Sequence, residues 1–175
     1  MRYDLDGTVL HVSRLRLLTD YPGQIDACLQ ILTDDELWWR PNEQSNAVAN
    51  LVLHLSGSNR YYFENVIGGR DVPRDRASEF AARGNYSRQA IVDTWTETRR
   101  ITAEILNGLQ PSQLMQTTER SGKLTTYAQI LLHVTHHNAA HMGQIVWITK
   151  MLHPTDVDEL WMKMQGRVLP TGKTT

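Results

Sequence analysis

The chain has 175 residues, a formal net charge of −1 and one cysteine, Cys28. Its apolar fraction of 41% and charged fraction of 21% are those of an ordinary globular protein. The net charge lacks the basic surplus of nucleic-acid-binding proteins, no apolar run is long enough to span a membrane, and one thiol cannot form an internal disulfide. We therefore expect a cytoplasmic protein, a single domain over residues 1–175, with no nucleic-acid or membrane partner.

Apolar residues recur three or four positions apart along most of the chain, which predicts amphipathic helices. Four long helices are expected near residues 13–32, 45–67, 87–108 and 126–152. Pro22 predicts that the first helix is kinked or begins near Asp20, and Ser45 or Asn46 is the expected N-cap of the second. Four such helices with little strand indicate an all-α helical bundle.

The connections between these helices are long enough for a crossover topology. Residues 70–85 are polar and are predicted to form a solvated loop, with one helical turn near residues 78–82. Its arginines, at positions 70, 74 and 76, alternate with acids. Residues 116–126 are expected to form a small hairpin, and the tail after Pro154 to dock through apolar side chains, namely Leu160, Trp161 and Met164.

Four of the seven histidines fall within nine positions of the fourth predicted helix. Residues four apart share one helix face, so His133, His137 and His141 form one line and His136 points elsewhere. His137 and His141 lie on the apolar stripe and therefore face the core. Burying their ring nitrogens without partners is costly, and a shared metal ion would satisfy one nitrogen of each ring.

A bundle metal site takes ligands from facing helices. His54 is the only histidine of the second predicted helix and lies on its apolar stripe, which makes it the third candidate ligand. By itself His54 would be interpreted as a hydrogen-bonded core residue; opposite the His137–His141 pair it favours a metal site. His11 and His153 lie near predicted helix ends and are poorer candidates.

Two familiar metal motifs do not fit the chain. The spacing of His137 and His141 is that of the zinc-protease HExxH motif, but Asn138 stands where that motif has its glutamate base. Di-iron carboxylate bundles need Glu-x-x-His pairs, and no histidine here has a glutamate three positions before it. A histidine-rich site suits one borderline metal, for which we expect zinc or nickel first, with iron or manganese as alternatives.

Two segments, Asn46–Gly57 (NAVANLVLHLSG) and His133–Ile145 (HVTHHNAAHMGQI), resemble the signature segments of the DinB/YfiT-like superfamily, and Leu37–Asn42 resembles the linker of its DUF1572-type branch. The resemblance covers about residues 13–151. It implies a four-helix bundle of up-down-down-up topology and a homodimer, to which apolar Trp161 and Met162 would contribute. It also implies that the metal ligands are the three histidines His54, His137 and His141.

Relatives of known activity are mostly transferases or isomerases that use low-molecular-weight thiols, and some carry an acid at the position of Asn138. Three neutral histidines leave metal coordination open to water or substrate, as in catalytic sites. The first hypothesis is thus a metal-dependent enzyme acting on a small molecule, with thiol transfer ahead of hydrolysis. His133 would orient substrate or relay protons, or be only a hydrogen-bonded neighbour. The alternative is a non-catalytic, metal-stabilised bundle that binds an unknown ligand or partner.

Overall fold

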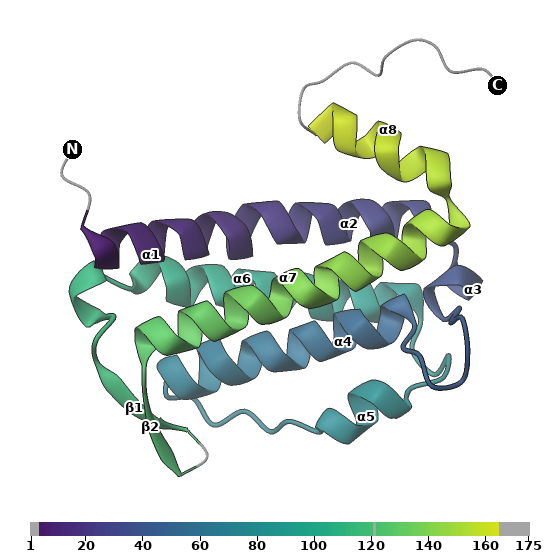
Figure 1. The fold of residues 1–175 in the computed structure, drawn as a ribbon. Coiled ribbons are helices and arrows are strands. Elements are labelled where there is room, and N and C mark those ends of the chain that lie inside the picture. The colour runs from purple at the N-terminus through teal and green to yellow at the C-terminus, as the bar shows by residue number, and fades with distance from the viewer. Residues whose placement is uncertain (1–3, 121, 165–175) are drawn as a thin grey trace.

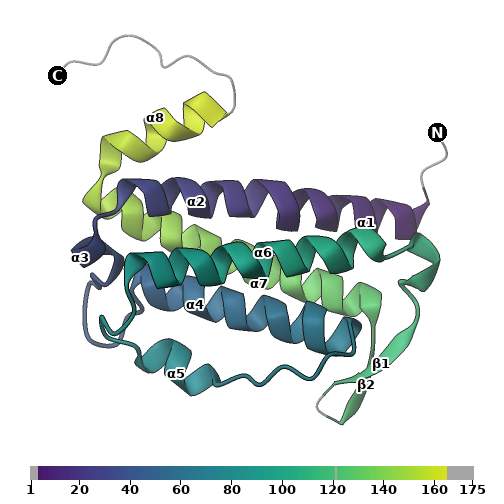
Figure 2. The ribbon, with the colours of Figure 1, turned by 180° about the vertical axis from the view of Figure 1, so that it is seen from behind.

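The computed structural model describes residues 4–120 and 122–164, with side chains as far as residue 159. Four long helical stretches form a bundle, and shorter elements lie around it (Figures 1 and 2). The helical elements, in chain order, are α1 (Leu5–Arg14), η1 (Leu15–Asp20), α2 (Tyr21–Ile31), α3 (Asp34–Leu37), α4 (Val48–Asn59), η2 (Arg60–Ile67), α5 (Arg76–Ala81), α6 (Arg88–Gly108), η3 (Pro111–Gln113), α7 (Tyr127–Leu152) and α8 (Pro154–Met164).

The bundle has the up-down-down-up topology. Figure 1 shows α1–α2 and α7 running in one direction, and α4 and α6 in the other. The connection from α4 and η2 to α6 therefore returns along the length of the bundle, and it carries α5 against the outside of α4. The predicted hairpin is confirmed: β1 (Thr117–Arg120) pairs antiparallel with β2 (Lys123–Thr126).

The first helix is longer than predicted. It begins at Leu5, where Asp4 caps it by accepting a hydrogen bond from the Gly7 N–H. Pro22 lies in the first turn of α2, as predicted, but the helical stretch does not start there, because the π-helical turns of η1 precede α2 without a break; the Tyr21 N–H bonds to the Arg16 carbonyl, five residues back. A π turn lets a helix continue past a residue that has no N–H to donate.

The second helix begins two to three residues later than predicted. Neither Ser45 nor Asn46 caps it: Ala47 occupies the N-cap position, and its N–H donates to the side-chain Oδ1 of Asn50, inside the first turn. The third and fourth helices begin where the sequence indicates, with Ser87 and Thr126 as side-chain caps, and Thr126 forms the expected capping box with Gln129.

Arginines tie the first helix to α6 at both ends. The Arg14 guanidinium donates to the carbonyls of Leu106 and Leu109, at the C-terminus of α6. Arg88, in the first turn of α6, donates to carbonyls at the C-terminus of α2. Each cation satisfies carbonyls that a helix end leaves unpaired, so these two neighbouring helices are fixed in register.

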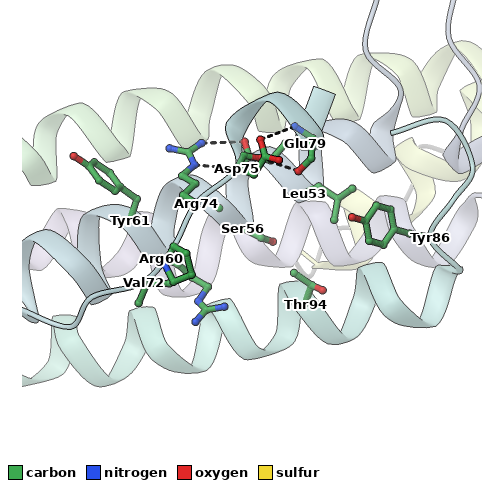
Figure 3. Close-up of a pocket in the computed structure, with 13 residues that line it drawn as sticks. Leu53, Ser56, Arg60, Tyr61, Val72, Arg74, Asp75, Glu79, Tyr86 and Thr94 are labelled. Atoms are coloured by element: carbon green, nitrogen blue, oxygen red, sulfur yellow. Dashed lines mark hydrogen bonds and ion pairs between the residues drawn. The ribbon is translucent and has the colours of Figure 1, made fainter. Parts of the chain in front are cut away.

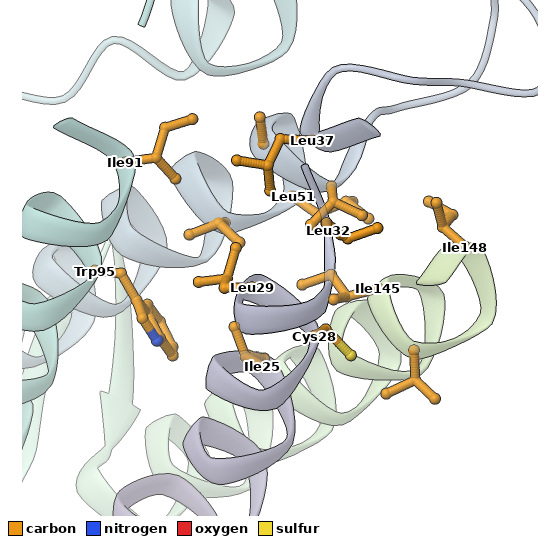
Figure 4. Packing of buried hydrophobic residues seen from close by; sticks show 14 of the residues in the cluster. Ile25, Cys28, Leu29, Leu32, Leu37, Leu51, Ile91, Trp95, Ile145 and Ile148 are labelled. Atoms are coloured by element: carbon orange, nitrogen blue, oxygen red, sulfur yellow. The ribbon is translucent and has the colours of Figure 1, made fainter. Parts of the chain in front are cut away.

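The apolar core consists of two clusters along the bundle. One surrounds Trp95 and Leu29 and takes Leu51, Leu55 and Ile145 from the second and fourth helices (Figure 4). The other surrounds Phe63 and includes these further residues: Tyr62, Leu131 and Val134. Between the two clusters, α4 and α7 carry buried polar residues, namely His54, Ser58, Asn59 and Asn138. The core therefore contains a polar layer where the candidate ligands lie.

The C-terminal α8 packs against α2 and α7, and Val157 is buried in the Trp95 cluster. The side chains of Leu160, Trp161, Met162 and Met164, predicted to dock or to dimerise, lie outside the described residues. Homodimerisation stays a prediction, which light scattering at micromolar concentration tests. No described helix is long and apolar enough to cross a membrane.

The contact between the end of α7 and α3 predicts a pH-dependent stability. His153 Nε2 lies 3.0 Å from Glu36 Oε2. The backbone N–H of Thr33, then His153 and the Thr33 hydroxyl, lower the pKa of Glu36 to about 2, and Glu36 above all raises the pKa of His153. The pair is fully charged above the ordinary glutamate pKa of 4.5 and below the ordinary histidine pKa of 6.5. Its stabilisation is lost as pH rises through the raised pKa of His153.

We therefore expect His153→Gln to lower the melting temperature more at about pH 5.5 than at about pH 8.5, because only the lower pH charges the imidazole. Thermal unfolding followed by circular dichroism checks this. His11→Gln, at an exposed position of α1, is the matched control and should show no such difference. An equal effect of His153→Gln at both pH values would contradict the interpretation.

Candidate metal centre

Three histidines from two helices converge in the polar layer. His54 projects from α4, and His137 and His141 project from successive turns of α7. Each offers a ring nitrogen, and these three atoms lie within 4.8 Å of one another. His54 Nε2 lies 3.0 Å from His137 Nε2. Three neighbouring imidazole nitrogens could hold one metal ion.

A carboxylate fixes the tautomer of His54, which is buried. Its Nδ1 lies 2.8 Å from Oε2 of Glu79, on α5. An ionised carboxylate only accepts hydrogen bonds, so Nδ1 carries the proton and Nε2 presents its lone pair toward His137. Burial opposes ionisation of Glu79, but hydrogen bonds from His54 and Arg74 outweigh it and lower the pKa of this carboxyl. A carboxylate behind a ligating histidine is a recurrent device for orienting the ring.

Arg74 holds the carboxylate of Glu79, and Asn50 holds its backbone. Arg74 binds it with two nitrogens, Nε to Oε1 at 2.8 Å and Nη2 to Oε2 at 3.0 Å. The buried Asn50 side chain donates to the backbone carbonyls of Glu79 and Ala82, which anchors α5 on α4. The solvated loop predicted for residues 70–85 is therefore wrong for Arg74 and Glu79. Their role could not be found from the sequence, since Glu79 is 25 residues from His54.

Gly57 makes room for this carboxylate. It lies in α4 one turn after His54, and a Cβ placed there would come within 2.9 Å of Glu79 Cδ and 3.2 Å of Arg74 Nε. Any side chain would therefore push Glu79 away from His54. Gly57 ends the Asn46–Gly57 segment of the sequence, but the steric need for a glycine at this position becomes visible only with α5 in place.

His137 and His141 are half-buried. Burial, followed by the charges of His141 and His54, lowers the pKa of His137 to about 3. Burial also lowers the pKa of His141, whose Nδ1 lies 2.8 Å from the side-chain oxygen of Gln144. Both rings are thus neutral at physiological pH, the form in which imidazole binds metals. Nδ1 of His137 is buried without a partner among the described residues.

His133, the predicted catalytic residue, lies one turn before His137 and its ring stacks on that of His137 at 5.9 Å. It is outside the group of converging nitrogens. Its Nε2 is 2.9 Å from the Tyr62 hydroxyl, and Arg120 of the hairpin lies over the Tyr62 ring. Burial, then the charge of Arg120, lowers the pKa of His133. His136 is exposed on another face of α7, as predicted.

Asn138, adjacent in sequence to His137, is a structural residue. It is buried and exchanges two hydrogen bonds with Asn59 of α4, at 2.8 and 3.1 Å, while its amide also donates to the Val134 carbonyl. Its polar atoms are thus committed to holding α4 and α7 together. It does not replace the missing base of the protease motif.

A pocket of about 190 Å³ adjoins the Arg74–Glu79 ion pair, between α4, the connection that carries α5, and α6 (Figure 3). Ser56, Arg60 and Tyr86 line it, but none of the three histidines does. The pocket therefore borders the supporting carboxylate rather than the converging nitrogens.

The donor set fits a borderline divalent metal. The Nδ1 atoms of His54 and His141 are used by Glu79 and Gln144, which leaves the Nε2 atoms as donors. Metal–nitrogen bonds of about 2.0–2.1 Å at tetrahedral angles separate ligand nitrogens by roughly 3.3 Å, within the observed spread. Zinc and nickel accept three imidazoles and retain positions for other ligands.

The Gly57 contact yields a matched pair of variants. Gly57→Ala should weaken zinc binding by about 10- to 100-fold, because it displaces the carboxylate that orients His54. Gly143→Ala is the control: Gly143 is also inside a helix, but its missing Cβ faces open space. That variant should keep zinc affinity and gain about 0.5–1 kcal/mol of stability, as alanine favours a helix over glycine. Titration with a competing chelator measures both. Equal zinc affinities of the Gly57→Ala and Gly143→Ala variants would mean that Glu79 does not support the site.

The chain was also compared with known proteins. A family model described as "Protein of unknown function (DUF1572)" matches residues 8–165, whereas no curated protein matches the chain. A DinB-like protein from Bacillus subtilis superposes with a TM-score of 0.59 at 19% identity, over 82% of this chain and 91% of that one. A DinB-like protein from Bacillus cereus gives 0.57 at 14%, over 90% and 95%. The bundle resembles the fold of these DinB-like proteins, and the match over residues 8–165 shows that the chain belongs to the DUF1572 family.

Proposed function

We propose that the protein is a metal-dependent enzyme in which His54, His137 and His141 hold one divalent metal ion, and that it joins the sulfur of a small thiol to an electrophilic carbon of a second substrate. The new sulfur–carbon bond replaces the bond from that carbon to a leaving group, and the thiol proton is released. The convergence of three neutral imidazoles within 4.8 Å carries the proposal. No fourth His, Cys, Asp or Glu of the described residues joins this group, so coordination positions are left for substrate. A metal bound there deprotonates a coordinated thiol without help from a protein base.

The surroundings favour thiol transfer over hydrolysis. Water bound to such a metal keeps a pKa of about 7, whereas a coordinated thiol is deprotonated outright, so hydrolysis gains more than thiol transfer from a base near the metal. Glu79, the carboxylate nearest the ligands, is behind His54 and is held by Arg74 on both oxygens. Asn138 is an amide fully engaged with Asn59. A thiol loses its proton through coordination alone, so this site suits a thiol better than water.

His133 and Tyr62 form the proton-handling pair of the proposed reaction. Tyr62 is largely buried and desolvation raises its pKa, so its hydroxyl stays protonated. His133 is neutral and its Nε2 is within hydrogen-bond distance of that hydroxyl. The pair can orient substrate beside the open positions and pass a proton to or from it. The His133 side chain reaches solvent, which supplies the exit for that proton.

The ligand assignment is tested by single substitutions. Alanine at His54, His137 or His141 should abolish stoichiometric metal binding, because two imidazoles do not retain the ion through dialysis. His136→Ala is the control and should bind one equivalent. Metal analysis of protein purified without a histidine tag provides the measurement. A His54→Ala protein that still holds one equivalent would refute the assignment. Bound metal should also stabilise the fold, by about 2.7 kcal/mol at a hundredfold excess over the dissociation constant.

The catalytic assignment needs variants that keep the metal. His133→Phe retains a ring against His137, and Tyr62→Phe removes only the hydroxyl. Both should bind zinc normally and lower kcat about 10²- to 10⁴-fold, the usual loss for a proton-transfer group. Thiol conjugation with bacillithiol, mycothiol and glutathione is the assay. Unchanged kcat in both variants would remove the pair from the mechanism. Metal binding without metal-dependent turnover would favour the alternative, a metal-stabilised binding protein.

A further inference from the structure

Two arginines near the histidine site have no acidic partner among the described residues. Arg76, in the first turn of α5, is exposed, and Arg120, at the end of β1, is half-buried. Several other arginines around the bundle are paired with carboxylates, for example Arg74 with Glu79 and Arg70 with Glu104. An uncompensated guanidinium beside a substrate site is available to bind an anion.

Each of these arginines is held in place by an aromatic ring that touches a site histidine. Arg76 lies over the Phe80 ring at 5.0 Å, and Phe80 packs on His54 with ring centroids 4.5 Å apart. Arg120 lies over the Tyr62 ring at 4.7 Å, and the Tyr62 ring is 5.0 Å from that of His133. Both distances are within the range of cation–π contact, which pre-positions the charges.

The two arginines are at opposite ends of the histidine line on α7. Arg120 lies next to His133 across the Tyr62 ring, and its charge acts on His133; Arg76 lies next to His54 across the Phe80 ring, and its charge acts on His141. His133 and His141 are eight residues apart, which is about 12 Å along a helix at a rise of 1.5 Å per residue. His137 lies between them. Figure 1 agrees: the hairpin and α5 are found toward opposite ends of α4 and α7.

We propose that the substrate, or the thiol cosubstrate, is an elongated small molecule that carries an anionic group at each end, one bound by Arg76 and the other by Arg120. The two charges of such a molecule are about 10–12 Å apart, to match the rise of α7 between His133 and His141. Its metal-binding group lies between the charges. The position of that middle group rests on the proposed function; the two anion sites rest only on Arg76 and Arg120.

A dicarboxylate series tests the anion sites without a thiol. Sebacate spans roughly 11 Å when extended, because each bond of a zigzag carbon chain adds about 1.25 Å to its length; succinate is too short to reach both arginines, and monomethyl sebacate has the length but one charge. With zinc-loaded protein, calorimetry should show sebacate binding about tenfold more tightly than either comparison ligand. Equal affinities would overturn the proposal.

Substitutions assign the sites. Arg76→Met and Arg120→Met keep an apolar stem over Phe80 and Tyr62, so they remove charge and leave packing. Each should weaken sebacate about five- to tenfold and leave the monoester nearly unchanged, and the double variant should abolish the preference for sebacate. Arg100→Met, at an arginine of α6 paired with Glu97 and Glu104, is the control and should have no effect. A preference that survives in the double variant would also overturn the proposal.

Cobalt spectroscopy separates a failure of these anion sites from a failure of the proposed thiol chemistry. In cobalt-substituted protein, thiol coordination produces a sulfur-to-metal charge-transfer absorption. If sebacate binding depends on both arginines but no thiol produces this absorption, the anion sites stand and the thiol chemistry does not. If thiols coordinate while sebacate and succinate bind alike, the reverse holds.

Discussion

The hydrogen bond between His54 Nδ1 and Glu79 connects the fold of this protein to its chemistry. A histidine inside a bundle, between two apolar clusters, loses its hydration and is stable only if its polar atoms find partners. The partner of Nδ1 is Glu79. The position of Glu79 depends on Arg74, on the hydrogen bond from Asn50 to its backbone and on the absence of a side chain at Gly57. With one nitrogen committed in this way, the other has a fixed direction, toward His137.

The topology supplies that carboxylate. Because α4 and α6 run in the same direction, the chain between them must return along the whole bundle, and this return segment carries Arg74, α5 and Glu79 over the outer face of α4. An up-and-down bundle with a tight turn would have no element there. The connection is therefore part of the site, since it completes the environment of a ligand on the neighbouring helix.

The helix α7 organises the other half of the site through its periodicity. A histidine at every fourth position produces a line along one face, and the environment changes along that line: His133 reaches solvent beside Tyr62, while His137 and His141 are half-buried opposite His54. One repeated residue type therefore takes different partners along a single helix face. The intervening Asn138 points across to Asn59 and holds α4 and α7 together where the three histidines converge.

The sequence by itself determined what short-range patterns encode: four helices with most of their ends, the hairpin, and the histidines that face the core, because helical periodicity and capping act within a few residues. It indicated His54 as a partner of His137 and His141 only through their shared burial. The tertiary structure alone decided the rest. The continuity of the first helix past Pro22 depended on a π turn, and the roles of Glu79, Gly57 and Asn138 depended on contacts between residues 22 to 79 positions apart. No local pattern encodes such contacts, because they exist only once the chain has folded back on itself.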